Sequence, residues 1–206
     1  MVAIDRKAHW EGVYSTRGET GVSWYQVEPR LSLDLIRSVA RATHGRIIDV
    51  GGGASVLVDR LLELPFAKIA VLDISETALS RARSRLGERA RRVDWIVADV
   101  TEIEALGTFD IWHDRAVFHF LTDPHDRSRY VDLALRTIPQ GGHLIIASFA
   151  DEGPKRCSDL DVCRYNAETM GAELGGGFSL VREARERHTT PCGSSQAFFY
   201  GVFRRQ

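Results

Sequence analysis

Short runs of β-branched residues alternate with helix-like segments through most of the chain, and this alternation limits the fold more than any other feature. The first strand is expected at Arg46 to Val50 and the second at Lys68 to Asp73, with a helix at Ser55 to Leu64 between them. Strands separated by helices form parallel crossover units, so the pattern predicts an α/β layered sheet. The further segments predicted in the same way are Glu76 to Leu86, Val93 to Ala98, Phe109 to Trp112, Asp126 to Ile138 and His143 to Phe149.

The last third of the chain departs from this alternation. A short helix is expected at Ala167 to Leu174, followed by strands at Ser179 to Arg187 and Gln196 to Arg204. A loop that contains Pro and Gly joins the two strands, which is typical of an antiparallel hairpin at a sheet edge. The sequence therefore predicts a doubly wound sheet of seven strands with an antiparallel C-terminal hairpin.

Length and charge indicate one soluble globular domain. The chain has 206 residues, a formal net charge of -1 and 44% hydrophobic residues, and the arginines between Arg81 and Arg92 suit a solvated helix and turn. We expect a core at 45–206 behind a helical, aromatic lid segment at 1–44, which includes a helix from Pro29 to Thr43. No signal peptide or membrane span is apparent, so we expect a cytoplasmic protein without nucleic-acid or membrane partners.

A run of glycines follows the first predicted strand. Gly51, Gly52 and Gly53 come directly after Ile47-Ile48-Asp49-Val50, and Ala54-Ser55 then leads into the next helix. Glycine has no Cβ, so the backbone can turn tightly here and a ligand can approach it closely. A tight turn without a ligand is the alternative. A dinucleotide fingerprint needs a further glycine where this chain has Val56, which disfavours a pyrophosphate.

Acidic residues stand where successive strands are expected to end. Asp49, Asp73, Asp99 and Asp114 each close one of the first four strands, and the carboxyl ends of parallel strands form the ligand-binding edge of an open α/β sheet. A single Asp at such a place often caps the next helix, but four in register indicate a site.

A nucleoside ligand accounts for these acids. We assign Asp73 to the two ribose hydroxyls and Asp99 to an adenine amino group, because carboxylates accept hydrogen bonds from both. Ile74 and Val100 are expected to cover the ring faces, and Asp49 suits the ammonium group of a methionine moiety.

The chain resembles the class I S-adenosylmethionine-dependent methyltransferases over about residues 45 to 204. The resemblance implies a Rossmann-like fold, S-adenosylmethionine as cofactor and S-adenosylhomocysteine as product. Ser55 stands where many members have a third glycine. The matching residues of the acidic-x-Gly-x-Gly pattern and the two later acidic positions are Asp49, Gly51, Gly53, Asp73 and Asp99.

The amino-terminal segment is similar to a subset of small methyltransferases that carry a Trp-x-x-x-Tyr element and a later Trp-Tyr pair. These residues are Trp10, Tyr14, Trp24 and Tyr25. Some members of that subset act on protein lysines and others on small molecules. We expect Trp10, Trp24 and Tyr25 to close a lid over the cofactor, although plain packing is the alternative.

Candidates for the reaction centre follow the fourth strand. His113 and His119 are the plausible neutral bases, and Arg115 is a candidate to hold an anionic substrate or the methionine carboxylate. Asp114 is a candidate both here and in the cofactor site. Packing of His119 among aromatic residues and pairing of Arg115 with a carboxylate are equally consistent with the sequence.

The three cysteines have no metal-site spacing. Cys157, Cys163 and Cys192 match the three thiols of arsenite methyltransferases in number only, so we expect incidental reduced thiols and no metal. The polar run from Asp151 to Asp161 is a candidate flap over the site.

Three functions remain open from the sequence. The leading one is methyl transfer to a small-molecule nucleophile, with a thiol, amine or oxygen acceptor. A protein-lysine methyltransferase is the first alternative. A non-catalytic nucleoside-binding regulator is the second, because a fold alone does not establish activity.

Overall fold

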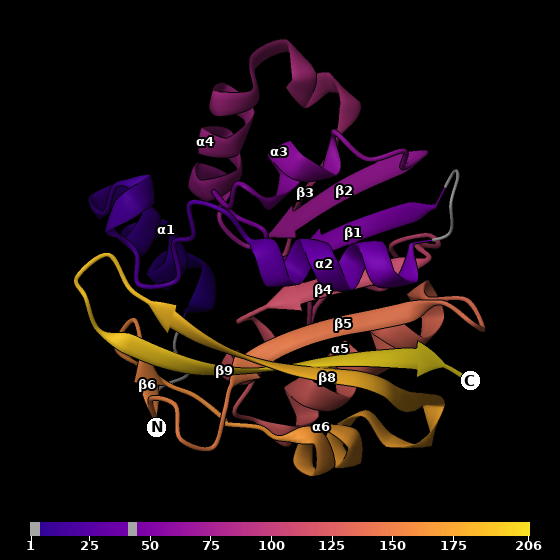
Figure 1. Ribbon diagram of the computed structural model, residues 1–206. Coiled ribbons are helices and arrows are strands. Elements are labelled where there is room, and N and C mark those ends of the chain that lie inside the picture. Colours follow the sequence, from indigo (N-terminus) through magenta and orange to yellow (C-terminus); the bar gives the residue numbers. More distant parts are fainter. Residues whose placement is uncertain (1–4, 41–44) are drawn as a thin grey trace.

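The computed structural model describes residues 5–40 and 45–206, which form a mixed seven-stranded sheet with helices on both faces (Figure 1). The strand order is β3-β2-β1-β4-β5-β9-β8. The strands of this sheet are β1 (Arg46–Val50), β2 (Lys68–Asp73), β3 (Asp94–Val97), β4 (Ile111–Arg115), β5 (His143–Phe149), β8 (Phe178–Thr189) and β9 (Ser195–Arg205).

The order of the strands reverses beside β1. This strand pairs in parallel with both β2 and β4, so that Val50 lies opposite Leu72 on one side and Asp114 on the other. β9 pairs antiparallel with β5 and with β8. The predicted doubly wound, Rossmann-like sheet with a C-terminal antiparallel hairpin is confirmed, and its switch point lies at the carboxyl end of β1.

Helices cover the sheet on two sides. In Figure 1, α2 crosses in front of β1 and β4, whereas α5 lies behind the sheet and α1 stands beside the carboxyl ends of the parallel strands. No helix of the described ranges is long and apolar enough to cross a membrane. The helices are α1 (Arg6–Thr16), α2 (Arg30–Val39), α3 (Leu57–Leu61), α4 (Glu76–Leu86), α5 (Pro124–Thr137) and α6 (Ala167–Leu174), with short 3-10 turns η1 (Glu19–Gly21), η2 (Gly87–Arg92), η3 (Phe118–Phe120) and η4 (Gly175–Gly177).

Several ends differ from the predicted ones. The helix expected at Ser55 to Leu64 is the short α3, and α5 begins at Pro124 because Asp123 caps it. The helix expected from Pro29 to Thr43 is α2, while residues 41–43 lie outside the described residues. Two two-residue strands, β6 (Arg156–Cys157) and β7 (Leu160–Asp161), form the candidate flap.

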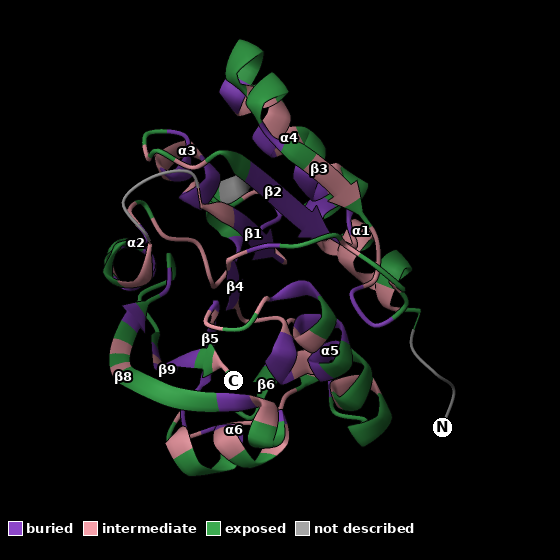
Figure 2. Ribbon diagram, turned by 90° about the vertical axis from the view of Figure 1, so that its right-hand side faces the viewer, coloured by how far each residue is buried: buried purple, intermediate pink, exposed green. Residues whose placement is uncertain are grey.

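The core has one layer on each face of the sheet. Trp112 and Tyr130 are fully buried on the side of α5, and Ile36, Leu61 and Ile145 are fully buried on the side of α2 and α3. Figure 2 shows β1 and β2 buried over most of their length and the edge strand β8 largely exposed. The described part of the expected lid segment therefore consists of two different parts. Helix α2 packs in this core, whereas α1 lies at the edge of the sheet.

The fourth strand is longer than predicted. β4 runs to Arg115, so His113 and Asp114 lie within the strand and not beyond its end. Side chains alternate along a strand, and Asp114 therefore faces Trp112 and Tyr130 on one side while His113 and Arg115 face the other. The polar sequence at 113–115 hid this extension, since buried charged residues are rare in a strand.

Candidate active site

The glycine turn connects β1 to α3 and has the geometry that only glycine provides. Gly51 has φ of 68°, and a Cβ there would lie 1.9 Å from a methyl of Val117. Gly53 has φ of 47°, and its Cβ would approach the hydroxyl of Tyr14 to 2.8 Å and Asp73 to 3.0 Å. The turn therefore leaves a cradle at the switch point that any side chain would fill.

A first cavity opens beside this turn at the ends of β1, β2 and β3. It encloses about 760 Å³ of space, part of it open to solvent. Asp73, Ile74, Asp99 and Val100 line one end, as the sequence predicted for an adenosine group, although their roles stay predictions. The other lining residues are Arg6, Trp10, Tyr14, Trp24, Val50, Gly51, Leu72, Ala98, Arg115, Ala116, Val117, Phe120, Leu121 and Cys157.

Asp73 is the most perturbed acid of the cavity. Its Oδ1 accepts a hydrogen bond of 2.8 Å from the Ser75 N–H, and the side chain is almost fully buried. Burial raises its pKa to about 7, with a further contribution from the carboxylate of Asp49 against the lowering effect of Ser75. A carboxylate held in this way gains from hydroxyl donors, which ribose supplies.

Asp99 lies two residues after β3 and contacts the amino-terminal helix. It accepts hydrogen bonds from the N–H and hydroxyl of Thr101, and Nε of Arg6 lies 3.4 Å from its Oδ2. Arg6 also donates to Asp126 of α5 at 3.0 Å. Arg6 thus ties α1 across this end of the cavity, which the sequence did not predict.

A second cavity, also partly open to solvent, lies on the other side of the glycine turn. Oδ1 of Asp49 lies 2.7 Å from Nδ1 of His113, within hydrogen-bond distance. Nε2 of the same ring lies 3.0 Å from the hydroxyl of Ser32. All three side chains are buried. Tyr25, Gly52 and Ser55 line the same cavity, and Ser55 also accepts a hydrogen bond from the Leu57 N–H.

His113 was predicted as a base past the strand, and this position is wrong. Both of its ring nitrogens have partners within the buried Ser32–His113–Asp49 chain. A neutral ring donates from Nδ1 to Asp49 and accepts from Ser32 at Nε2. The arrangement orients Asp49 toward the glycine turn.

Asp114 does not line either cavity, contrary to the prediction for the cofactor site. It accepts hydrogen bonds from the N–H groups of Val117 and Phe118 and, at 2.6 Å, from the hydroxyl of Tyr130. Burial raises its pKa to about 6, opposed by these hydrogen bonds. Asp114 therefore fixes the turn after β4, which is the capping role that the sequence left open.

His119 is buried in an aromatic environment and lines neither cavity. The centre of its ring lies 4.4 Å from that of Phe120 and 4.7 Å from that of Phe149. Its Nδ1 accepts a hydrogen bond of 3.3 Å from the Phe149 N–H. Burial lowers its pKa to about 3, and the nearby Arg115 adds to this effect. The packing alternative thus fits the geometry better than a base.

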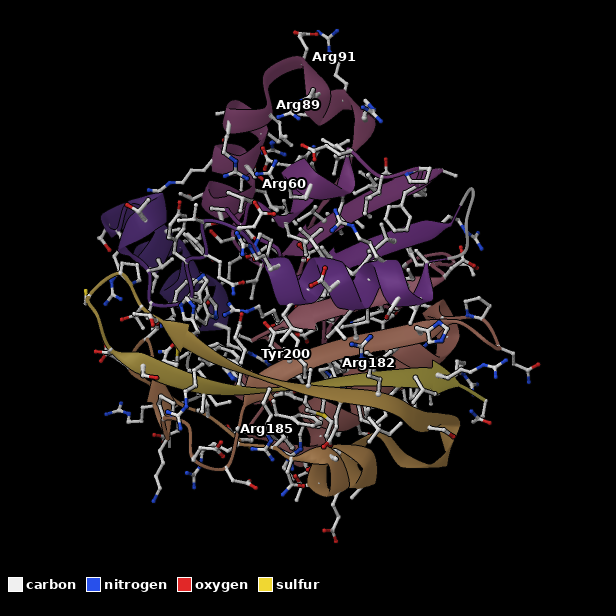
Figure 3. All side chains as sticks on the ribbon, in the orientation of Figure 1. Arg60, Arg89, Arg91, Arg182, Arg185 and Tyr200 are labelled. Carbon is white, nitrogen blue, oxygen red and sulfur yellow. The ribbon has the colours of Figure 1, made fainter. Side chains whose placement is uncertain are left out.

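Arg115 lines both cavities at their junction. Its Nε donates to the hydroxyl of Tyr200 at 2.8 Å, and its Nη1 donates to the carbonyl of Trp24 at 3.1 Å. Glu186 lies 3.5 Å from Nη2, and the guanidinium stacks 4.4 Å from the ring centre of Phe198. Tyr200 lies on β9 in the sheet (Figure 3).

Aromatic side chains of the amino-terminal segment cover the junction. Trp10 packs edge-on against Trp24 and Phe120, with 5.7 Å and 4.9 Å between the ring centres. The ring centres of Tyr14 and Trp24 lie 6.1 Å apart. Tyr14 lines both cavities, and burial followed by the charge of Asp73 raises its pKa well above the ordinary value. The Trp-x-x-x-Tyr element signalled Tyr14, but its contact with the glycine turn was not predicted.

Glu11 attaches α1 to the start of α4. Its carboxylate accepts hydrogen bonds from the Ser75 hydroxyl and from the N–H groups of Glu76 and Thr77. Burial opposes ionisation of Glu11, but the hydrogen bonds from Thr77 and Ser75 outweigh it and lower the pKa. This contact holds the helix that carries Trp10 and Tyr14 over the first cavity.

Replacing Glu11 by Ala should destabilise the protein by about 1 kcal/mol, the usual value of a helix cap. Because the pKa of Glu11 is lowered in the fold, its contribution is present above the unfolded pKa of 4.5 and lost as the pH falls below it. Urea unfolding at pH 7 and pH 4 measures both effects. Glu88→Ala, which removes an exposed ion pair with Arg91, is the control, and an equal loss in the two variants would contradict the cap.

The cysteines do not form a disulfide. Cys157 is buried and lines the first cavity, Cys163 is half-buried, and Cys192 is exposed in the β8–β9 turn. Within residues 5–40 and 45–206 there is no group of three or more His, Cys, Asp or Glu side chains that could hold a metal ion.

Comparison with known proteins points to one class. A family model described as a methyltransferase domain matches residues 47–142. Nodulation protein S of Rhizobium tropici is 27% identical over 140 residues, which cover 68% of this chain and 56% of that protein. The eEF1A lysine and N-terminal methyltransferase of Mus musculus is 27% identical over 190 residues, which cover 89% of this chain and 27% of that protein.

Solved structures agree on the fold. The N-methyltransferase NodS from Bradyrhizobium japonicum WM9, in complex with S-adenosyl-l-homocysteine, has a TM-score of 0.74 and 19% identity, with 95% of this chain and 97% of that chain covered. A doubly wound sheet with a glycine cradle and acids at its switch point has the edge at which open α/β proteins bind their ligands. Residues 47–142 thus match a methyltransferase domain, and the chain has the fold of the class I S-adenosylmethionine-dependent methyltransferases, while it spans only about half or less of the length of these curated relatives.

Proposed function

We propose that the protein transfers the methyl group of S-adenosylmethionine to a small-molecule nucleophile. The observation that carries this proposal is the first cavity, which Trp10, Trp24 and Phe120 wall with rings packed on one another. The cavity between these packed rings has room for a compact acceptor, and the rings themselves exclude water. The proposed location is the cytoplasm, and neither nucleic acid nor membrane takes part.

The chain's own residues fit the cofactor in three places. Asp73 would accept from the ribose hydroxyls, Asp99 from the adenine amino group, and Asp49 from the methionine ammonium. When bound, S-adenosylmethionine supplies an electrophilic methyl group that a nucleophile takes directly. The protein therefore needs to align the two reactants and keep water out, and no covalent bond to the enzyme is required.

A protein-lysine acceptor is the second candidate. The alignment with the mouse eEF1A lysine and N-terminal methyltransferase covers 89% of this chain. Since that protein is far longer than the aligned part, its substrates suggest a test and do not identify an acceptor here.

Incubation with S-adenosylmethionine and acceptor panels tests the proposal. We expect release of S-adenosylhomocysteine and a mass gain of one methyl group in at least one member of a panel of small thiols, amines, phenols and carboxylates. Peptides with a free N-terminus and a lysine should remain unmodified. Methylation of peptides alone would favour the second candidate, and binding of S-adenosylhomocysteine without turnover of any acceptor would favour a regulator.

A further inference from the structure

The reacting position lies where the two cavities meet. Four residues line both of them, namely Tyr14, Trp24, Gly51 and Arg115. An adenosine group at Asp73 and a methionine group at Asp49 would place the sulfur between them, at this junction. Of the four residues, Arg115 carries the only permanent charge.

The guanidinium of Arg115 is fixed and has donors to spare. Its side chain is 10% exposed, and two of its five N–H groups donate to Tyr200 and Trp24. Nη2 is buried without a hydrogen bond, although Glu186 lies 3.5 Å away. The other titratable groups near Arg115 are His119 on η3, Cys157 on β6, His188 on β8 and Tyr200 on β9.

The described residues that line the cavities include no free neutral base. His113 is engaged at both nitrogens, and burial raises the pKa values of Tyr14 and Cys157, so the phenol and the thiol stay protonated. The remaining carboxylates, Asp49, Asp73 and Asp99, belong to the proposed cofactor site. An acceptor that must lose a proton during attack would find no partner at the junction.

We infer that the acceptor is a small thiol that reacts as its thiolate, with the negative charge held by Arg115. This inference rests on the proposed function. The thiolate sulfur forms a bond to the methyl carbon as the bond between that carbon and the cofactor sulfur breaks. The bond's electron pair goes to the cofactor sulfur, and no proton moves in the step.

The charge of Arg115 separates this acceptor class from an amine. A thiolate carries a negative charge that pairs with the guanidinium, whereas a neutral amine has no charge to pair with it. Thiols also ionise closer to neutral pH than phenols do, so a nearby positive charge is enough to supply the reactive form. The inference therefore also disfavours a lysine acceptor.

Binding to the protein saturated with S-adenosylhomocysteine tests the inference without turnover. The probes are benzenethiol and 2-mercaptoethanol, with aniline and 2-aminoethanol as the matched amines. We expect calorimetry to show at least about tenfold tighter binding of each thiol than of its amine at pH 8. Ultraviolet absorption of bound benzenethiolate should give a pKa about one unit below that of the free thiol, since a single favourable charge has this effect.

Variants of the charged pair should move that pKa in opposite directions. Arg115→Gln should raise it toward the value of the free thiol, Arg115→Lys should restore part of the shift, and Glu186→Gln should lower it further by removing the opposing charge. Arg91→Gln is the control, because Arg91 lies far from Tyr200 in Figure 3 and is 81% exposed. Glu186→Gln provides the test if Arg115→Gln does not fold.

Two results would overturn the inference. One is equal or tighter binding of the amines, and the other is loss of S-adenosylhomocysteine binding in Arg115→Gln with binding of 5′-methylthioadenosine retained, which would assign Arg115 to the methionine carboxylate. Failure of the wild-type protein to bind S-adenosylhomocysteine at all would instead contradict the proposed function.

Discussion

Replacing Asp73 by Asn should weaken the binding of S-adenosylhomocysteine by about 1 to 3 kcal/mol, the range for removing a partner of a buried hydrogen bond. The Asn side chain retains an oxygen that accepts the hydrogen bond from the Ser75 N–H. Its amide nitrogen, however, cannot accept a hydrogen bond from a ribose hydroxyl. In the wild-type protein the affinity should also fall as the pH drops below about 7, because the carboxyl then gains a proton. Calorimetry across this pH range measures both effects.

The same variant should make the unliganded protein more stable. The pKa of Asp73 rises from 3.8 to about 7 on folding, so the native state keeps a proton that the unfolded chain has lost, and stability falls as the pH rises between these values. Asn avoids burying the charge, and we expect a gain of roughly 1 to 4 kcal/mol above pH 7 and almost none at pH 4. Urea unfolding at both pH values gives the difference.

Asp34→Asn serves as the control for Asp73→Asn, because Asp34 is a 68% exposed carboxylate on α2. It should change neither affinity nor stability noticeably. Unchanged affinity in a folded Asp73→Asn variant would show that the ribose lies elsewhere. A variant that loses both affinity and stability at pH 8 would mean that Asp73 supports the fold and not the ligand.

The sequence predicted the sheet and the acids at its edge because both depend on short-range patterns. Alternating strands and helices have few possible connections, and an acid at the end of a parallel strand must lie at the ligand-binding edge. Asp73 and Asp99 therefore line the first cavity and Asp49 the second, as expected. Asp114 fails this rule because β4 continues past it and turns its side chain into the core.

Contacts between distant segments were beyond the reach of the sequence. Arg6 reaches Asp99, Glu11 caps α4, and Ser32 meets His113, and each pair joins an amino-terminal helix to the core across more than 60 positions. No periodicity or local spacing encodes such a pair. Histidines after the fourth predicted strand suggested bases, but only the three-dimensional structure shows that one ring is bonded to Asp49 and the other is packed among phenylalanines.

Replacing His113 by Gln should weaken S-adenosylhomocysteine binding by about ten- to a hundredfold, whereas His113→Asn should stay within about threefold of wild type. The Asn amide nitrogen takes the place of Nδ1 and can still donate to Asp49, while the Gln amide nitrogen takes the place of Nε2 and reaches only Ser32. The two variants therefore separate the bond that orients Asp49 from the bond that anchors the ring.

A second ligand distinguishes orientation of Asp49 from general damage to the fold. 5′-Methylthioadenosine has the adenosine group of the cofactor without its amino acid part, so it makes no use of Asp49. If His113 acts through Asp49, then His113→Gln should bind this ligand as wild type does, and Ser32→Ala should show a smaller loss confined to S-adenosylhomocysteine. Equal losses for both ligands would assign His113 to packing alone. A lowered turnover in His113→Asn at saturating cofactor, with a shifted pH profile, would instead return it to the role of a base.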